Sequence, residues 1–190
     1  MFPVLGRPLL SHTFDLLRSA SISEVAVNIH HLPDCIVDYF KNDQPPYLNL
    51  HFSREEKILG TAGGIKKMQN FLEDEPFMLI NSDIITDIDL NSVIDFHKKK
   101  NSKLTLVVRQ DNSQGKYDPI EIREDGRIVH FIGASSMNIP DNTTRVMFTG
   151  IQIVEPEIFD RIPSGRFYGT TEDVFPQMVN DGIPIYGYLY

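Results

Sequence analysis

Short apolar runs alternate along the chain with segments in which apolar residues recur every three or four positions. The helical pattern is clearest where Leu9, Leu10, Phe14 and Leu17 share one face of a helix predicted over 8–19. Residues 77–80, Phe-Met-Leu-Ile, instead form an unbroken apolar run, which predicts a central strand covered on both faces. This alternation is typical of a layered α/β fold.

The same pattern assigns elements to the rest of the chain. Further helices are predicted over 33–41, directly after the glycines at 60–64, from Asp89 or Asn91 to Lys100, and over 157–162 and 171–179. Further strands are predicted over 25–29, 48–52, 104–109, 148–154 and 185–190, with a hairpin over 119–132 and a polar loop over 134–147. No internal repeat or low-complexity stretch divides the chain, so residues 1–190 are predicted to form a single domain.

Composition and charge exclude several classes of protein. A net charge of -8 argues against a general nucleic-acid binder, which needs a basic face. No apolar run approaches the roughly 20 residues of a membrane span, and Met1 is not followed by a basic and apolar leader. The lone Cys35 cannot form an internal disulfide, which fits a reducing compartment. We therefore expect a cytoplasmic protein without a membrane or nucleic-acid partner.

A glycine-rich stretch, Gly60-Thr61-Ala62-Gly63-Gly64, stands directly before a helical pattern. Glycine lacks a Cβ, so a planar base or a phosphate can approach the backbone closely. A helix N-terminus adds free N–H donors and a partial positive charge. The stretch is thus a candidate nucleotide site, and the competing interpretation is a tight turn from a loop into a helix.

A second candidate, Asp83, follows the apolar run at its carboxyl end, where open α/β sheets bind ligands. A carboxylate there could hold Mg²⁺, which prefers hard oxygen ligands and usually binds substrate phosphates as well. The competing interpretation is an aspartate that caps a turn. Asp87 and Asp89 are expected to be turn and cap residues, and the pair His30–His31 is expected to end a strand.

Six stretches, taken in order, resemble the sugar-1-phosphate nucleotidyltransferases, the enzymes that make nucleoside-diphosphate sugars. They are FPVLGRPLLSHTFDLL, VAVNIHHLPDCIVDYF, EEKILGTAGGI, FMLINSDIITDIDL, FTGIQIVEPEIFDRIP and TTEDVFPQMVNDGIPIYGY. The nearest members are those that use mannose 1-phosphate or N-acetylmuramate 1-phosphate. The resemblance implies a three-layer, Rossmann-like α/β fold with a mixed, mostly parallel sheet.

The resemblance also implies a reaction and its partners. A sugar 1-phosphate attacks the α-phosphorus of a nucleoside triphosphate, and pyrophosphate leaves. Both reactants are anions, so positioning and charge neutralisation by Mg²⁺ supply most of the catalysis. GTP is the favoured triphosphate and a GDP-mannose-like compound the favoured product, while the sequence leaves open whether the protein forms a homo-oligomer.

Site residues carry over from the resemblance position by position. Gly60, Thr61, Ala62 and Gly63 would meet the base and ribose through backbone groups. Glu55 matches a position that reads the base edge, and a carboxylate can accept from the N1–H and amino group of guanine. Asp83 would be the catalytic magnesium ligand, and Asp118, Thr149, Gly150 and Glu172 would lie around the sugar.

Several parts of the family pattern are not among these 190 residues: a Gly-x-Gly-x-Arg phosphate loop, the Lys-Pro pair after it and a second metal-binding aspartate. The domain is therefore expected to be truncated at both ends relative to the family and to be a poor catalyst on its own. The family's first strand would lie centrally in the sheet. Without it, the neighbouring strands are expected to expose unpaired N–H and C=O groups.

Three alternatives stay open at this point. The chain could be a non-catalytic homologue that binds a sugar nucleotide, or a uridylyltransferase that forms a UDP-sugar. It could also be a glycosyltransferase with a related nucleotide-binding architecture, in which Asp87-Ile88-Asp89 would supply paired metal ligands.

Overall fold

The computed structural model describes residues 2–111, 119–136 and 142–190. Its helices are α1 (Leu9–Ser19), α2 (Pro33–Asn42), α3 (Gly60–Lys67), α4 (Gln69–Leu72), α5 (Leu90–Lys100), the 3₁₀ helix η1 (Pro156–Arg161), the π-helix η2 (Thr170–Val174) and α6 (Phe175–Asn180). Its strands are β1 (Pro3–Val4), β2 (Arg7–Pro8), β3 (Glu24–Ile29), β4 (Asn49–Arg54), β5 (Phe77–Ile80), β6 (Leu104–Gln110), β7 (Ile120–Ile122), β8 (Ile128–Phe131), β9 (Ala134–Ser135), β10 (Thr144–Val154) and β11 (Ile185–Leu189).

The main sheet has seven strands in the order β11-β6-β10-β7-β8-β9, and β5 also pairs with β10. β11 lies parallel to β6, whereas every other pairing within this sheet is antiparallel. The expected mixed α/β architecture is confirmed, but the expectation of a mostly parallel sheet is wrong. The reason is that the long strand β10 runs against its neighbours and that β7 and β8 form a tight hairpin.

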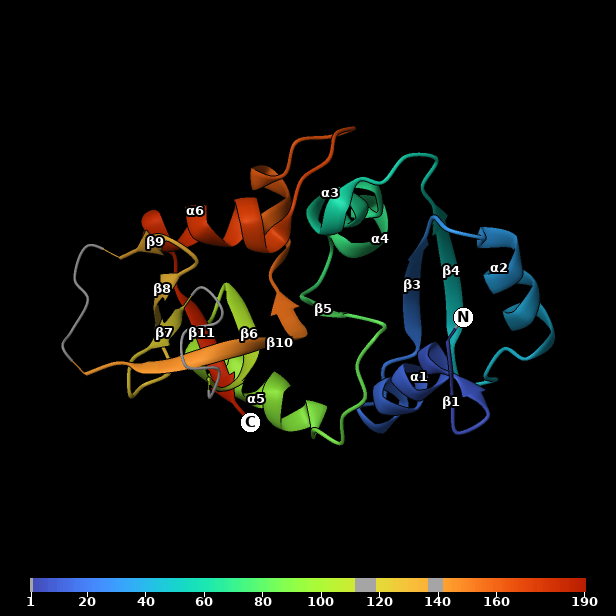
Figure 1. The fold of residues 1–190 in the computed structure, drawn as a ribbon, viewed down its shortest axis with the longest axis horizontal. Coiled ribbons are helices and arrows are strands. Elements are labelled where there is room, and N and C mark those ends of the chain that lie inside the picture. The colour runs from blue at the N-terminus through green and yellow to red at the C-terminus, as the bar shows by residue number, and fades with distance from the viewer. Residues whose placement is uncertain (1, 112–118, 137–141) are drawn as a thin grey trace.

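The strands β3 and β4 form a separate parallel sheet, with Glu24 opposite Asn49 and Ile29 opposite Arg54. This pair stands apart from the main sheet in Figure 1, with α1 and α2 beside it. Within the described residues β3 pairs only with β4, and β5 pairs only with β10. β5 is therefore not the fully covered central strand that its apolar run predicts, and Met78, Leu79 and Ile80 are only half-buried.

Most predicted elements appear within one or two residues of their expected bounds, but four details differ. The predicted loop over 134–147 contains β9 and the first residues of β10, which pair with β8 and β7. The helix after the glycines is interrupted at Met68, and the helix expected over 171–179 divides into η2 and α6. The short hairpin β1–β2 was not predicted at all, because each of its strands has only two residues.

The main sheet lies between two layers of helices, and one apolar cluster covers each of its faces. The first cluster joins α6, including Phe175 and Met178, to the face of the sheet that carries Leu106. The second joins α1 and α5 to the opposite face, and its partly buried members include Val25 and Val27 of β3. Figure 1 shows α6 and α5 on opposite sides of the main sheet.

The buried side chain of His97 has a hydrogen-bond partner at each ring nitrogen. His97 of α5 lies 2.8 Å from the hydroxyl of Thr105 through Nδ1 and 3.2 Å from the carboxylate of Glu155 through Nε2. Burial lowers the pKa of His97, and the neighbouring Glu155 carboxylate opposes that shift. No helix in the described part of the chain combines the length and apolarity that crossing a membrane requires.

Candidate functional site

The helix α3 begins in the glycine-rich stretch, and its first turn packs against the segment 166–168. The carbonyl oxygen of Tyr168 accepts from the N–H groups of Ala62 and Gly63, at 3.0 and 3.1 Å. Gly60 has φ +73°, and a Cβ built on it would lie 2.6 Å from that same oxygen. Gly60 is therefore required by contacts within the protein, and two of the amides that could meet a nucleotide already have a partner.

Glu55 is buried at the end of β4, where it holds the start of α3 in place. One carboxylate oxygen accepts from the side-chain amide of Asn28 at 3.2 Å, and the other accepts from the N–H of Leu59 at 3.0 Å. A Cβ on Gly64 would lie 2.8 Å from the first of these oxygens. Both oxygens of Glu55 are thus engaged within the protein, which the resemblance to a base-reading position did not anticipate.

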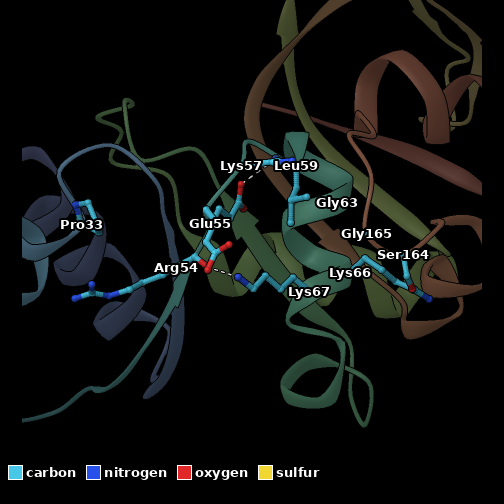
Figure 2. A pocket seen from close by; sticks show the side chains of 11 residues that line it. Pro33, Arg54, Glu55, Lys57, Leu59, Gly63, Lys66, Lys67, Ser164 and Gly165 are labelled. Atoms are coloured by element: carbon cyan, nitrogen blue, oxygen red, sulfur yellow. Dashed lines mark hydrogen bonds between the residues drawn. The ribbon is translucent and has the colours of Figure 1, made fainter.

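A large hollow of about 950 Å³ lies on one side of α3 and contains Glu55 and Gly63. Figure 2 shows four cationic side chains around it, those of Arg54, Lys57, Lys66 and Lys67. Three of them are bonded within the protein. Lys66 donates to the carbonyl of Phe159, Lys67 donates to the carbonyl of Arg54, and the Arg54 guanidinium pairs with Asp34. The bonds of Arg54, Lys66 and Lys67 stabilise the local structure.

A second hollow, of about 490 Å³, lies between β3 and β5, and we call it the inter-sheet groove. Thr61 at the start of α3 and Asp83 after β5 both line this groove, as do Asn28, Asn81 and Thr170. The two strongest sequence candidates for ligand contact are therefore brought to one cavity. Glu55 and Gly63 line the other hollow, so the predicted base-reading set is divided between the two sides of α3.

The acidic residues after β5 separate into different roles. Asp83 is exposed at the groove. Asp89 caps α5 by accepting from the N–H of Asn91 at 3.0 Å, as predicted for a cap residue. Asp87 accepts from the Tyr190 hydroxyl. Because both acids of Asp87-Ile88-Asp89 already have partners, this pair is poorly placed to supply the metal ligands that a glycosyltransferase would need.

The residues expected around the sugar lie at different depths. Thr149 donates its hydroxyl to the carbonyl of Val107 at 2.9 Å, and Gly150, with φ +92°, is buried in an irregularity of β10. The Gly150 carbonyl accepts from the N–H of Asn81 at 2.9 Å, which ties this irregularity to the edge of the groove. Glu172 is exposed in η2 beside Gly169. Asp118 lies outside the described residues.

Sequence reasoning missed three polar residues that line the groove: Thr170, Asn28 and Asn81. Thr170 is buried and shares a 2.9 Å hydrogen bond with the hydroxyl of Thr61, whose oxygen also accepts from the Thr170 N–H at 2.8 Å. Asn28 follows the apolar part of β3 as Asn81 follows β5, and both line the groove. The signal available for both asparagines was the position of a polar residue at the carboxyl end of a strand.

A family model described as nucleotidyl transferase matches residues 1–189 of this chain. The chain belongs to this nucleotidyl transferase family. The expected relationship to the sugar-1-phosphate nucleotidyltransferases is confirmed by the relatives below. No group of three or more His, Cys, Asp or Glu side chains is arranged for a metal ion within residues 2–111, 119–136 and 142–190.

Curated relatives of this chain include proteins named for different nucleotides. It is 30% identical to a UTP--glucose-1-phosphate uridylyltransferase of Synechocystis, over 98% of this chain and 51% of that protein. It is 28% identical to a mannose-1-phosphate guanylyltransferase of Mycobacterium tuberculosis, over 100% of this chain and 52% of that protein. The chain therefore spans about half the length of the curated relatives that it matches.

A solved structure supports the fold of this chain. HddC from Yersinia pseudotuberculosis, in a crystal structure complexed with GMP-PN, superposes with a TM-score of 0.81 at 20% sequence identity. The match covers 100% of this chain and 80% of that one. At this identity the likeness establishes the fold, and it confirms the expected Rossmann-like nucleotidyltransferase architecture.

Proposed function

We propose that the protein joins a nucleoside triphosphate to a sugar 1-phosphate, forming a nucleoside-diphosphate sugar and releasing pyrophosphate. The observation that carries this proposal is the inter-sheet groove, because Thr61 and Asp83 line the same cavity. Family membership supports the reaction class, and the curated relatives are named for reactions of this kind.

Asp83 is the proposed magnesium ligand and the proposed catalytic residue. Its carboxylate is exposed at the groove, directly after β5, and offers the hard oxygen donor that Mg²⁺ prefers. One protein carboxylate suits a Mg²⁺ ion that completes its coordination with substrate phosphates and water. When bound, the ion would offset the repulsion between the two anionic substrates.

The other groove residues would position the substrates. The Thr61 hydroxyl is fixed by Thr170, so the first turn of α3 presents a defined polar edge to the groove. Asn81, two residues before Asp83, donates its N–H to the Gly150 carbonyl, and both residues line the groove. Holding the reacting oxygen in line with the α-phosphorus supplies much of the catalysis that such a reaction needs. We propose that four further residues lie around the sugar: Thr149, Gly150, Glu172 and Asp118.

Guanine is the proposed base, with GDP-mannose or a similar compound as product. Relatives named as mannose-1-phosphate guanylyltransferases support this choice, whereas the relative named as a uridylyltransferase supports the alternative. Glu55 would act on base choice indirectly, because its carboxylate fixes the N–H of Leu59 and the start of α3. The proposed base and ribose contacts are backbone groups of Gly60, Thr61, Ala62 and Gly63. Those of Ala62 and Gly63 would be groups other than the N–H groups that bond the Tyr168 carbonyl.

The decisive experiment measures nucleotide binding by the chain with fluorescent GTP and UTP, with and without Mg²⁺. We expect Asp83→Asn to remove the Mg²⁺-dependent part of the affinity and to leave the unfolding midpoint unchanged, because Asp83 is exposed. Asp95→Asn is the matched control, since Asp95 is an exposed acid on α5 outside the groove lining. Wild-type Mg²⁺ dependence in Asp83→Asn would contradict the metal role.

A turnover assay separates the remaining alternatives. Pyrophosphate release would be measured for GTP and UTP, each combined with mannose 1-phosphate, glucose 1-phosphate and N-acetylmuramate 1-phosphate. Release with GTP and mannose 1-phosphate supports the proposal, and release with UTP alone would identify a uridylyltransferase. Nucleotide binding without release from any pair would identify a non-catalytic binder.

A further inference from the structure

The large hollow beside α3, which we call the lysine hollow, gathers more positive than negative side chains. Its lining contains four cations and two acids: Arg54, Lys57, Lys66, Lys67, Glu55 and Glu56. The chain as a whole has 18 lysines and arginines against 26 acids, for a net charge of -8. The local balance is thus the reverse of the overall one, and a hollow lined mainly by one sign of charge favours ligands of the opposite sign.

Two lysines of the hollow are bonded to neutral groups. Arg54 pairs with the Asp34 carboxylate at 2.5 Å, whereas Lys66 and Lys67 donate to the carbonyl oxygens of Phe159 and Arg54. An ammonium group has three N–H donors, so Lys66 and Lys67 each keep two of them for another partner. Lys66 is also half-buried, and a charge that is partly removed from water is costly unless an opposite charge meets it.

The acids of the hollow leave its lysines without an opposite charge. Both carboxylate oxygens of Glu55 accept from neutral donors, the side-chain amide of Asn28 and the N–H of Leu59. Glu56 and Lys57 are exposed, and neither has an ion-pair partner among residues 2–111, 119–136 and 142–190. Across the same ranges no carboxylate pairs with any of the three lysines that line the hollow. An anion from outside the chain would meet three uncompensated positive charges there.

Neutral donors lie across the hollow from Arg54, where Ser164 and Gly165 follow η1. Gly165 has φ +72°, and no atom lies within 4 Å of a Cβ built on it, so its backbone faces open space. The Ser164 hydroxyl has no hydrogen-bond partner in the described part of the chain. Figure 2 shows the Lys66 side chain extending toward Ser164. An ammonium and a hydroxyl brought together in this way are the donors that an oxyanion needs.

The lysines are distributed around the hollow instead of meeting at one point. In Figure 2 the side chains of Lys57, Lys66 and Lys67 extend in three different directions. The volume of about 950 Å³ is within the range of small-molecule sites, and Pro33 and Leu59 add apolar surface to the lining. A single phosphate would leave part of this charge unused, whereas a ligand with two separated phosphates would meet more of it.

We propose that the lysine hollow is a second ligand site, which binds a small molecule with two phosphate groups joined by a short spacer. Lys66 and Ser164 would hold one phosphate, and Lys57 and Lys67 would attract the other. Among the described residues none lines both this hollow and the inter-sheet groove that contains Asp83. The inference therefore holds whichever nucleotide or reaction the protein uses.

The test adds 1,6-hexanediol bisphosphate to the 190-residue chain in the presence of EDTA, with hexyl phosphate as the matched probe that has one phosphate. Binding is followed residue by residue through the amide chemical shifts in NMR spectra. We expect the amides of Lys57, Lys66, Lys67 and Gly165 to shift, and the bisphosphate to bind roughly tenfold more tightly than hexyl phosphate. Raising the salt concentration from about 50 mM to about 300 mM is expected to weaken binding several-fold.

Two substitutions that remove the same charge make the test specific. Lys57→Gln removes an exposed cation that has no partner in the described chain, so the unfolding midpoint is expected to stay unchanged. Its affinity for the bisphosphate is expected to fall about tenfold, the cost of one lost bond to a charged group. Lys99→Gln is the matched control, since Lys99 is exposed on α5 outside the lining of the hollow, and its affinity is expected to equal that of wild type.

Several results would overturn the proposal. Equal losses of affinity in Lys57→Gln and Lys99→Gln would mean that the probe responds only to the overall charge. Shifts confined to Thr61 and Asp83, or displacement of the probe by GTP, would place the probe in the proposed nucleotide site. The absence of binding at about 10 mM bisphosphate would exclude the site. Asp83→Asn is expected to bind the bisphosphate as wild type does, so a failure of this proposal and a failure of the proposed function give different results.

Discussion

The strands β6 and β3 are both apolar, yet they experience very different environments. β6 pairs with β10 on one edge and β11 on the other, and Leu104, Leu106 and Val108 are 0% exposed. Among the described strands β3 pairs with β4 alone, and its residues 25–27 are only half-buried. The difference shows that burial of an apolar strand depends on what lies along both edges as well as on its two faces.

Buried polar groups show the same contrast between the closed and the open part of the molecule. Around β6, Thr105 and His97 are buried and hydrogen-bonded to each other. Along the inter-sheet groove, the oxygens of Thr13 and Gln152 are buried without a partner. The buried polar groups of the closed part are therefore paired, whereas the open part contains buried polar oxygens without a partner among the described residues.

The largest expected effect comes from replacing a leucine by alanine in the closed part and, for comparison, in the open part of the molecule. Leu106→Ala in β6 is expected to lower the free energy of unfolding by about 4 kcal/mol, because it leaves a cavity in a fully buried site. Leu50→Ala in β4 is expected to cost about 1 kcal/mol, since Leu50 is half-buried and its site can relax. Urea unfolding of both variants measures the difference, and equal losses would refute the contrast.

The second prediction concerns α3, which lies between the two parts. Gly60→Ala is expected to cost roughly 3 kcal/mol, because φ is +73° and the new Cβ would lie 2.6 Å from the Tyr168 carbonyl oxygen. Gly165→Ala is the control, with φ +72° and no atom within 4 Å, and its cost is expected to be roughly 1 kcal/mol. Thermal unfolding compares the stability of the two variants. Equal losses would mean that backbone strain alone, without the contact to Tyr168, explains why position 60 requires glycine.

The third prediction sets two threonines against each other. Thr105→Val removes a hydroxyl that bonds His97 and is expected to destabilise the chain by about 1 kcal/mol. Thr13→Val removes a hydroxyl without a partner and is expected to stabilise it by about 1 kcal/mol. Opposite signs in urea unfolding support the contrast. A loss of stability in Thr13→Val would show that its hydroxyl is already satisfied.

The smallest expected effect is a pH dependence. Burial lowers the pKa of His97 in the folded chain, so the unfolded chain binds a proton at higher pH than the folded one. His97 should therefore make the folded state lose stability as the pH falls from about 7 towards 5. Unfolding midpoints across this range should depend less on pH in His97→Gln than in wild type.

Much of the fold could be predicted because its elements have strong local signals. The face formed by Leu9, Phe14 and Leu17 gave α1, and Pro33 marked the start of α2. The strand β9 and the start of β10 were missed because Thr144, Arg145 and Met147 give no clear apolar alternation around Val146. The prediction of a mostly parallel sheet was also wrong, since an apolar strand does not indicate whether its neighbours run parallel or antiparallel.

The candidate site was harder to predict from the sequence. Asp83 and Thr61 could be selected, because one follows an apolar strand and the other begins a helix. The family resemblance predicts that Glu55 contacts the base, whereas its carboxylate oxygens accept from Asn28 and Leu59 within the protein. Residue type and spacing do not show which partner a polar group finds, because that depends on contacts between segments far apart in the chain.

The glycine at position 150 has a consequence for how the strands of the main sheet align during folding. Its φ of +92° suits glycine alone, and its neighbours on β10 are Thr149 and Ile151, both branched at Cβ. A shift of β10 by one residue would force one of them into that conformation and would remove the bond from Asn81 to the Gly150 carbonyl. A single residue without a side chain thus penalises misaligned pairings with β5 and β6 while the sheet assembles.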